Sequence, residues 1–208
     1  LLHNRKFLEH SKKNPRDVQE DDIKAYLVRL LEKKLSASSL ALVKSALRFY
    51  YEEILGRDIF KNIKTPKKEK KLPTVLTKEE IKRMLETVRN NKSKLIISML
   101  YSSGLRLSEV LNLKLNDLEL KEKIGWVRKG KGKKDRLFIL SETLINELEG
   151  HTKNKEPSSF LFPGKSGRMS ARNIQKIISS TARRANISKK VTPHSLRHSF
   201  ATHLLGAG

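Results

Sequence analysis

The sequence is most informative where it runs Thr192-Pro193-His194-Ser195-Leu196-Arg197-His198-Ser199-Phe200-Ala201-Thr202-His203-Leu204-Leu205. Thr192 is a typical N-cap residue and Pro193 suits the first helical position, so a helix is predicted to begin here. His194 and Arg197 are three residues apart and therefore share one face of that helix. A titratable imidazole beside a fixed cation, near a helix N-terminus, suits an anionic ligand and above all a phosphate.

The overall charge points to the same kind of partner. The chain has 208 residues, with 45 Lys and Arg against 22 Asp and Glu, and a formal net charge of +23. A surface rich in ion pairs is the alternative explanation for many lysines, but bases outnumber acids too strongly for pairing. A hydrophobic content of 37% is enough for a core and excludes a disordered basic tail. The composition therefore favours a folded protein that binds a polyanion, namely nucleic acid.

Other classes of protein are disfavoured by what the composition lacks. The chain has no cysteine, which excludes disulfides and thiolate metal sites. No apolar run approaches the roughly 20 residues that a membrane-spanning helix needs, so no membrane partner is expected. No signal peptide is visible, and the expected location is cytoplasmic and associated with the nucleoid.

Residues 1–60 are predicted to form a small helical DNA-binding domain. An apolar stripe at helical spacing runs through residues 21–35. A second helix is expected to start near Ser38 or Ser39 and to end near Gly56, a residue type that favours helix ends.

Residues 61–73 differ in character from both flanks, with two prolines, many lysines and few apolar residues. This composition predicts an interdomain linker that is extended by the repulsion between its own charges. A plain surface loop is the alternative. In a DNA-binding protein such a basic strap can also lie along phosphates.

Residues 74–208 are predicted to form a second domain that begins with a capping box at Thr77 and Glu80. The residue pattern then predicts two strands that flank a glycine-rich basic hairpin loop. The helices are expected at residues 95–101, 108–113 and 170–185, and the strands at residues 124–127 and 136–140. The predicted fold class is mainly α with a small antiparallel β-sheet.

Two further basic segments accompany the His194 segment. Arg106 lies in a turn just before a short predicted helix, where it suits either a structural ion pair with Glu109 or an anion site. Lys131 lies between two glycines in the hairpin loop, where the backbone can approach a ligand and lysine can deliver a mobile charge or a proton. The spacing is not that of a phosphate-binding P-loop, and a solvated loop is the alternative.

A metal site is a competing interpretation of the third segment. His194 and His198 are four residues apart and could both ligate Zn²⁺. No Asp or Glu is close in sequence to complete the ligand set, and the surroundings are strongly cationic, so no metal is predicted.

Together the three segments closely resemble the tyrosine recombinase (lambda-integrase) family, and within it the cellular Xer recombinases. The resemblance covers nearly the whole chain. Its specific motifs are Thr192–Leu205, Tyr101-Ser-Ser-Gly-Leu-Arg106-Leu-Ser-Glu109 and Gly-Lys131-Gly-x-Lys134-x-Arg136. Residues 1–60 resemble the family's helical core-binding domain more loosely, through Ser45-Ala46-Leu47-Arg48 and the aromatic residues after it.

The resemblance implies a catalytic role for four residues. Arg106 and Arg197 correspond to the two arginines that hold the non-bridging oxygens of the scissile DNA phosphate. Lys131 corresponds to the hairpin lysine that protonates the departing 5′ oxygen, and His194 to the histidine that assists proton transfer at the nucleophile. Guanidinium groups suit the charge that builds on the phosphoryl oxygens.

The implied reaction is attack by a tyrosine, which gives a 3′-phosphotyrosyl link and a free 5′-hydroxyl. The bond energy is kept in that link and the arginines take the place of Mg²⁺, so neither ATP, a metal nor another cofactor is expected. The nucleophile is not among the four tyrosines, Tyr26, Tyr50, Tyr51 and Tyr101, which all precede His194. In the family it follows the His-x-x-Arg motif, together with a further His or Trp, so both are expected beyond Gly208.

The sequence thus predicts an Xer-type site-specific recombinase that resolves chromosome dimers through a Holliday junction. Its expected partners are double-stranded DNA carrying a specific recombination site and further copies of itself, in a homo-tetramer or dimer of dimers. A phage or mobile-element integrase, a non-catalytic DNA-binding protein of the same fold and a type IB topoisomerase are the alternatives. The residues expected to contact DNA outside the catalytic set are Lys44, Arg48, Lys67, Lys68, Lys134, Arg136, Arg172 and Lys176.

Overall fold

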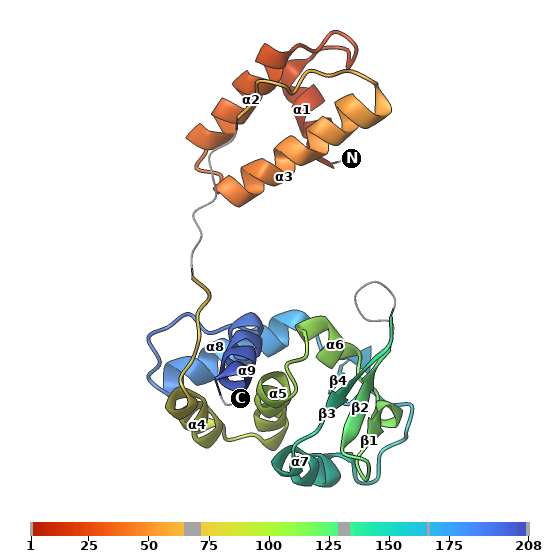
Figure 1. Cartoon of the computed structure of the whole chain (residues 1–208), viewed down its shortest axis with the longest axis vertical. Helices are drawn as coiled ribbons and strands as arrows, with labels where there is room; N and C mark the ends of the chain where they lie inside the picture. Colours follow the sequence, from red (N-terminus) through yellow and green to blue (C-terminus); the bar gives the residue numbers. More distant parts are fainter. Residues whose placement is uncertain (1, 65–71, 129–133, 166, 207–208) are drawn as a thin grey trace. The chain divides into compact units, whose positions relative to one another are not determined.

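The computed structural model describes residues 2–64, 72–128, 134–165 and 167–206, and divides the chain into two compact units, residues 1–71 and 72–208 (Figure 1). Lys67, Lys68 and Lys131 lie outside the described residues. Within those residues, no helix has both the length and the apolar character needed to cross a membrane.

The first unit is helical. It contains α1 (Leu2–Ser11), α2 (Glu20–Glu32) and α3 (Ala37–Arg48), and α3 continues into a π-helical segment, Phe49–Ile54. Helix α3 begins before the predicted start because the hydroxyl of Ser36, rather than of Ser38 or Ser39, caps it by accepting the N–H of Ser39. Helix α1 was not predicted, because Phe7 is its one buried side chain and its sequence carries little apolar pattern.

A core of large side chains holds these helices together. The fully buried members include Phe7, Ile23, Leu40, Leu47 and Tyr51. Phe7 meets Tyr26 and Tyr51 edge to face, at ring-centroid separations of 5.2 and 6.2 Å. Such contacts stabilise a small core beyond the burial of apolar area alone.

The second unit is built around a central apolar helix. Its helices are α4 (Lys78–Thr87), α5 (Asn91–Ser102), α6 (Leu107–Asn112), α7 (Glu142–Thr152), α8 (Ala171–Arg184) and α9 (Pro193–Leu205). Helix α5 buries Leu95, Ile96, Ile97, Met99 and Leu100, which surround its axis, as expected for a helix enclosed by others. Helix α7 was not predicted from the sequence.

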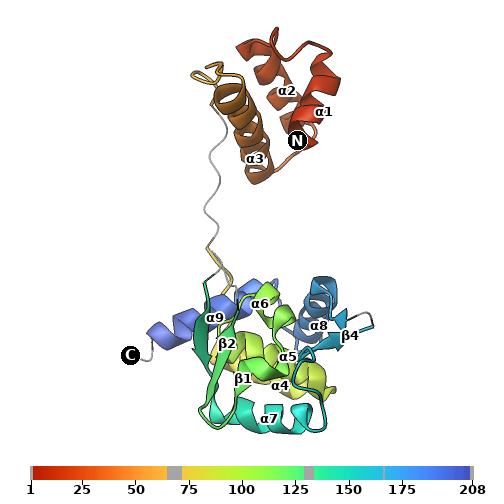
Figure 2. The ribbon, with the colours of Figure 1, turned by 90° about the vertical axis from the view of Figure 1, so that its right-hand side faces the viewer.

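A three-stranded antiparallel sheet covers one side of the second unit (Figures 1 and 2). Its strands are β1 (Leu118–Glu119), β2 (Ile124–Val127) and β3 (Arg136–Ile139), in that order. Strands β4 (Pro163–Gly164) and β5 (Gly167–Arg168) form a separate antiparallel pair. The predicted fold class, mainly helical with a small antiparallel sheet, is therefore confirmed.

The sheet has one buried and one exposed face. In the register, Val127 pairs with Arg136 and Gly125 with Phe138. Phe138 is buried while Leu137 is exposed, as expected from the alternation of side chains along a strand. Arg136 shares the face of Phe138 and is therefore directed toward the interior of the unit.

Helix α9 is held in the second unit by polar contacts at its middle and near its C-terminal end. The buried hydroxyl of Ser199 accepts the N–H of Leu76, at 2.8 Å. The Tyr101 hydroxyl of α5 lies 2.9 Å from Nδ1 of His203. These contacts hold α9 against Leu76, just before α4, and against α5, and so fix the helix that carries His194 and Arg197.

Candidate active site

The turn between α5 and α6 requires a glycine. Gly104 has a φ of +58°, a left-handed conformation that other residues rarely adopt. A Cβ atom at this position would lie 2.5 Å from Cδ1 of Phe200 on α9. Gly104 therefore allows α9 to pack directly over the turn that leads to Arg106.

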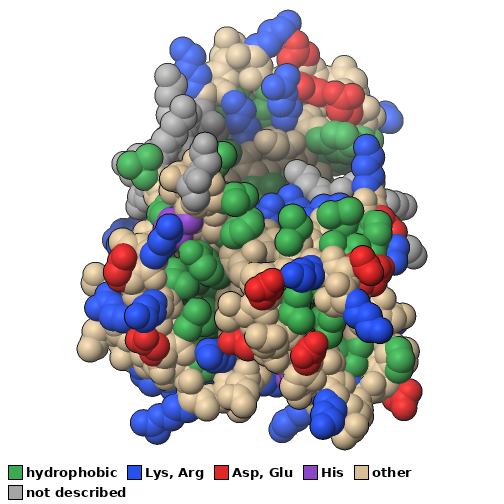
Figure 3. Space-filling view, turned by 60° about the horizontal axis from the view of Figure 1, so that its bottom comes forward, with side chains coloured by type: hydrophobic (Ala, Val, Ile, Leu, Met, Phe, Trp, Pro, Cys, Tyr) green, Lys and Arg blue, Asp and Glu red, His purple; other side chains and the backbone are tan. Residues whose placement is uncertain are grey.

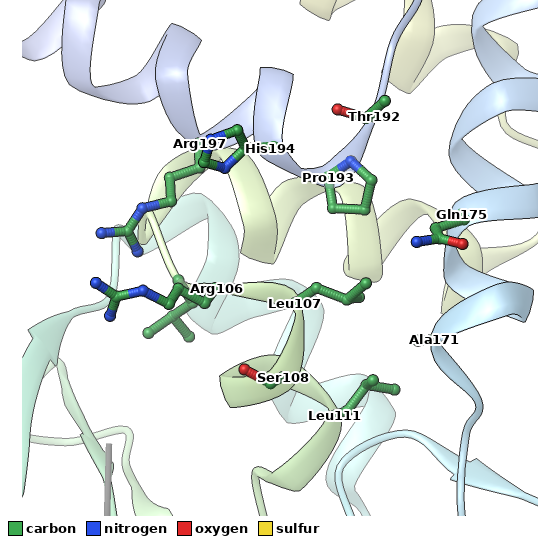
Figure 4. A pocket seen from close by; sticks show the side chains of 11 residues that line it. Arg106, Leu107, Ser108, Leu111, Ala171, Gln175, Thr192, Pro193, His194 and Arg197 are labelled. Carbon is green, nitrogen blue, oxygen red and sulfur yellow. The ribbon is translucent and has the colours of Figure 1, made fainter. Parts of the chain in front are cut away.

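The N-terminus of α9 forms as the sequence predicts. Thr192 caps the helix, with its hydroxyl 3.1 Å from the N–H of Ser195, and Pro193 occupies the first turn. Figure 4 shows His194 and Arg197 close together on α9, and both line the same cavity as Arg106. The predicted shared face is therefore confirmed.

Two arginines from distant segments meet at this site. In Figure 4 the guanidinium groups of Arg106 and Arg197 lie side by side and point in the same direction. The Arg197 guanidinium donates to the carbonyl of Gly104, so α9 and the α5–α6 turn are joined at this point. Burial and the neighbouring charge of Arg106 lower the pKa of Arg197, as expected where like charges share a site that suits an anion.

A buried carboxylate, Glu109, organises these arginines. Its Oε1 accepts from Nη1 of Arg106 at 2.8 Å, and its Oε2 accepts from the backbone N–H of Arg106 and from Nη2 of Arg136, both at 2.7 Å. Nη1 of Arg197 lies 4.0 Å from Oε2. The predicted ion pair between Arg106 and Glu109 is confirmed, and Arg106 also lies beside Arg197, so the two alternatives for Arg106 are compatible.

The arginine cluster (Arg106, Arg136 and Arg197) keeps an excess of positive charge, because Glu109 is the one carboxylate among the ion-pair partners of these three described residues. Burial alone would raise the pKa of Glu109, but hydrogen bonds from Arg106 and the charge of Arg136 lower it. Glu109 is therefore ionised at neutral pH and cancels one of three cationic charges. The remaining charge favours an anionic ligand.

A cavity of about 560 Å³ adjoins the site, where α6, α8 and the start of α9 meet. Arg106, His194 and Arg197 line it together with apolar side chains such as Leu107 and Leu111 (Figure 4). The cavity is thus cationic on one side and apolar on the other. By contrast, acidic side chains lie among basic ones on the face in Figure 3, so charge alone does not single out that face.

His194 is exposed and has a second histidine as its neighbour. Nε2 of His194 lies 2.9 Å from Nε2 of His198. No group of three or more His, Cys, Asp or Glu side chains suited to a metal ion occurs among the residues that the structure describes. The histidine pair therefore lacks a third ligand of these types within the described ranges.

The remaining sequence-predicted residues have varied surroundings. Lys44 donates to the carbonyl of Ile63, and Arg48 pairs with Glu52, so both charges have intramolecular partners. The residues Lys134, Arg172 and Lys176 are exposed, and Arg136 is bound to Glu109. Sequence reasoning missed the contact between Arg136 and Glu109, because these residues are 27 positions apart and lie on different elements, β3 and α6, that meet only in the folded unit.

Two of the four tyrosines, Tyr51 and Tyr101, have packing roles in the structure. Tyr101 contacts His203, as the interpretation of Tyr101 as a packed aromatic requires. Tyr51 is fully buried, and burial raises the pKa of its hydroxyl to about 12, which leaves it a poor nucleophile.

The chain matches two related families along its length. Residues 74–208 match the phage integrase family, and residues 4–61 match the N-terminal SAM-like domain of phage integrases. The tyrosine recombinase XerA of Pyrococcus horikoshii is 38% identical over 193 residues, which are 90% of this chain and 67% of XerA.

Solved structures show the same likeness. The crystal structure of XerA recombinase has a TM-score of 0.61 and 32% sequence identity, and the match covers 100% of this chain and 76% of that one. The XerH site-specific recombinase bound to its difH substrate, in a pre-cleavage complex, has a TM-score of 0.73 and 25% identity. That match covers 93% of this chain and 61% of the XerH chain.

Proposed function

The chain belongs to the phage integrase family of site-specific tyrosine recombinases, which break and rejoin DNA, and from this premise we propose that Arg106 and Arg197 together hold the scissile phosphate. The observation that carries this proposal is the convergence of both guanidinium groups on one face, over a single buried carboxylate. Each guanidinium offers paired N–H donors that fit phosphate oxygens.

The remaining catalytic roles are proposed from the resemblance to the family, and the chemistry of phosphoryl transfer is consistent with them. As the transition state forms, negative charge spreads over the non-bridging oxygens, and fixed guanidinium groups stabilise it. His194, exposed at the rim of the same cavity, assists proton transfer at the attacking hydroxyl. Lys131 protonates the departing 5′ oxygen, and the attacking tyrosine lies beyond Gly208.

The DNA partner is supported by the related XerH, whose structure is a complex with its difH substrate. We place this chain on double-stranded DNA with a specific recombination site, in a homo-tetramer that exchanges strands through a Holliday junction. Its cellular role is Xer-type resolution of chromosome dimers at the nucleoid, in the cytoplasm. Integration of a phage or mobile element is the second candidate, and it is compatible with the match to the phage integrase family.

The decisive prediction is a covalent adduct. A binding selection from random duplexes with the 208-residue chain first identifies the preferred site. A nicked suicide substrate with that site, incubated with protein from the complete coding sequence, is expected to trap a 3′-phosphotyrosyl adduct, because the short fragment past the nick diffuses away and religation fails. A denaturing gel with 3′-end mapping measures it.

One control variant and two possible outcomes separate the alternative functions. The Tyr→Phe variant of the mapped tyrosine, which is expected past Gly208, should form no adduct. Complete protein that binds the selected site yet forms no adduct would leave only the non-catalytic DNA-binding function. Relaxation of supercoiled plasmids that lack the site would instead indicate a type IB topoisomerase.

A further inference from the structure

Arg136, on β3, binds the same carboxylate, Glu109, that binds Arg106. It is the first residue of β3 and pairs with Val127 at the end of the hairpin where the basic loop begins. Its side chain is on the buried face of the sheet, the face of Phe138, and its Nη2 is 2.7 Å from Oε2 of Glu109. A residue adjoining the basic loop is thereby tied to the N-terminal turn of α6.

The hydrogen bond from Arg136 completes the set of donors to one oxygen, Oε2, of the buried Glu109 carboxylate. Oε2 of Glu109 already accepts the backbone N–H of Arg106, and Arg136 supplies its second donor. A carboxylate oxygen has two lone-pair positions, so these two donors saturate Oε2. Arg197 lies 4.0 Å from the same oxygen and donates to the Gly104 carbonyl instead.

We propose that Arg136 is a positioning residue that occupies Glu109 and so keeps Arg197 available for the scissile phosphate. Without Arg136, the buried Oε2 would lose a charged donor, and leaving a buried charge short of partners is costly. Arg197 is the nearest cation that can replace it. Its movement toward Glu109 would take a guanidinium from the phosphate, so the chemical step would suffer more than DNA affinity. The inference rests on the proposed catalytic function.

The first test is single-turnover cleavage of the suicide substrate by the full-length protein at saturating DNA. R136A is expected to slow cleavage about 10- to 100-fold, the range for a lost hydrogen bond to a charged group, with DNA affinity changed less than about 3-fold. R136K should recover part of the rate, since lysine supplies a cationic donor but not the planar fork.

Arg128 provides a matched control on the same hairpin. Among the described residues it forms ion pairs with Asp117 and Asp135, whereas Arg136 pairs with Glu109. R128A removes the same charge from the same hairpin and should change the cleavage rate less than about 2-fold. An equal loss in R128A and R136A would show that hairpin stability, and not Glu109, explains the effect.

A double-mutant cycle with E109Q tests whether Arg136 acts through Glu109. In the E109Q background, R136A should add less than about 3-fold to the loss, because residues that act on one another are not additive. If the fold-losses in cleavage rate of R136A and E109Q multiply in the double variant, Arg136 contacts the phosphate itself. If R136A lowers only the affinity for DNA, Arg136 is a DNA contact. Either result overturns the proposal.

A crystal structure of the R136A chain gives an answer that needs no activity. Arg197 is expected to leave the Gly104 carbonyl and bond directly to Glu109. An Arg197 that keeps its place in this variant would overturn the inference. Failure of the wild-type protein to form the covalent adduct would instead overturn the proposed function, so the two failures are distinguishable.

Discussion

Replacing Arg197 with alanine is expected to lower the rate of DNA cleavage about 10³-fold, while the affinity for the site changes less than about 3-fold. The guanidinium of Arg197 lies beside that of Arg106, and both line the same cavity. Its donors act mainly on charge that develops in the transition state. Affinity, in contrast, is shared among many phosphate contacts along the duplex.

The measurement is the amount of covalent adduct formed with time at saturating suicide substrate, beside a binding titration of the same variant. R197K serves as the partner variant, because it keeps the charge but loses the paired donors, and it should remain at least about 10-fold slower than wild type. R89A removes an exposed arginine of the same unit and should cleave normally. Parallel losses of cleavage and binding in R197A would mean that Arg197 is structural.

The parts of this site that sequence reasoning predicted are those that depend on neighbouring residues. The Thr192 cap, Pro193 at the start of α9, and the Thr77–Glu80 capping box are formed by residues within one turn of each other. For the same reason His194 and Arg197 could be placed on one face before any coordinates. Short-range rules suffice where the chain itself supplies the partner.

The missed features depend on contacts between distant segments. The prediction of Arg136 as a DNA contact stays a prediction, and its pairing with Glu109 was missed because it joins β3 to α6 in the folded unit. Helix α1 forms because Phe7 completes a core made by other helices, and its own pattern gives little sign of it. The domain boundaries and the role of Lys131 stay predictions, and Lys131 lies outside the described residues.

The requirement for glycine at position 104 has a local cause and a long-range cause. The turn itself is local, but the side chain that lies against it, Phe200, comes from α9. Gly104→Ala is expected to destabilise the second unit by about 2–5 kcal/mol, from a left-handed conformation without glycine and from overpacking against Phe200. Relief of this overpacking is expected to move the backbone at position 104, and with it the carbonyl that accepts from Arg197. Cleavage should therefore fall even where the protein remains folded.

Urea unfolding followed by the fluorescence of Trp126, the one tryptophan of the chain, reports the second unit directly. Gly56→Ala is the matched control, because Gly56 also has a positive φ, of +64°, but a Cβ atom there meets nothing within 4 Å. In Gly56→Ala the free energy of unfolding of the first unit, followed by circular dichroism, should fall only by the backbone cost of about 1–2 kcal/mol. The additional loss of unfolding free energy in Gly104→Ala then measures the steric overlap with Phe200. Adding Phe200→Leu to the Gly104→Ala variant should recover part of that free energy. Equal losses at both glycines would contradict the close packing of α9 on the turn, and with it the reason that Arg106 and Arg197 meet.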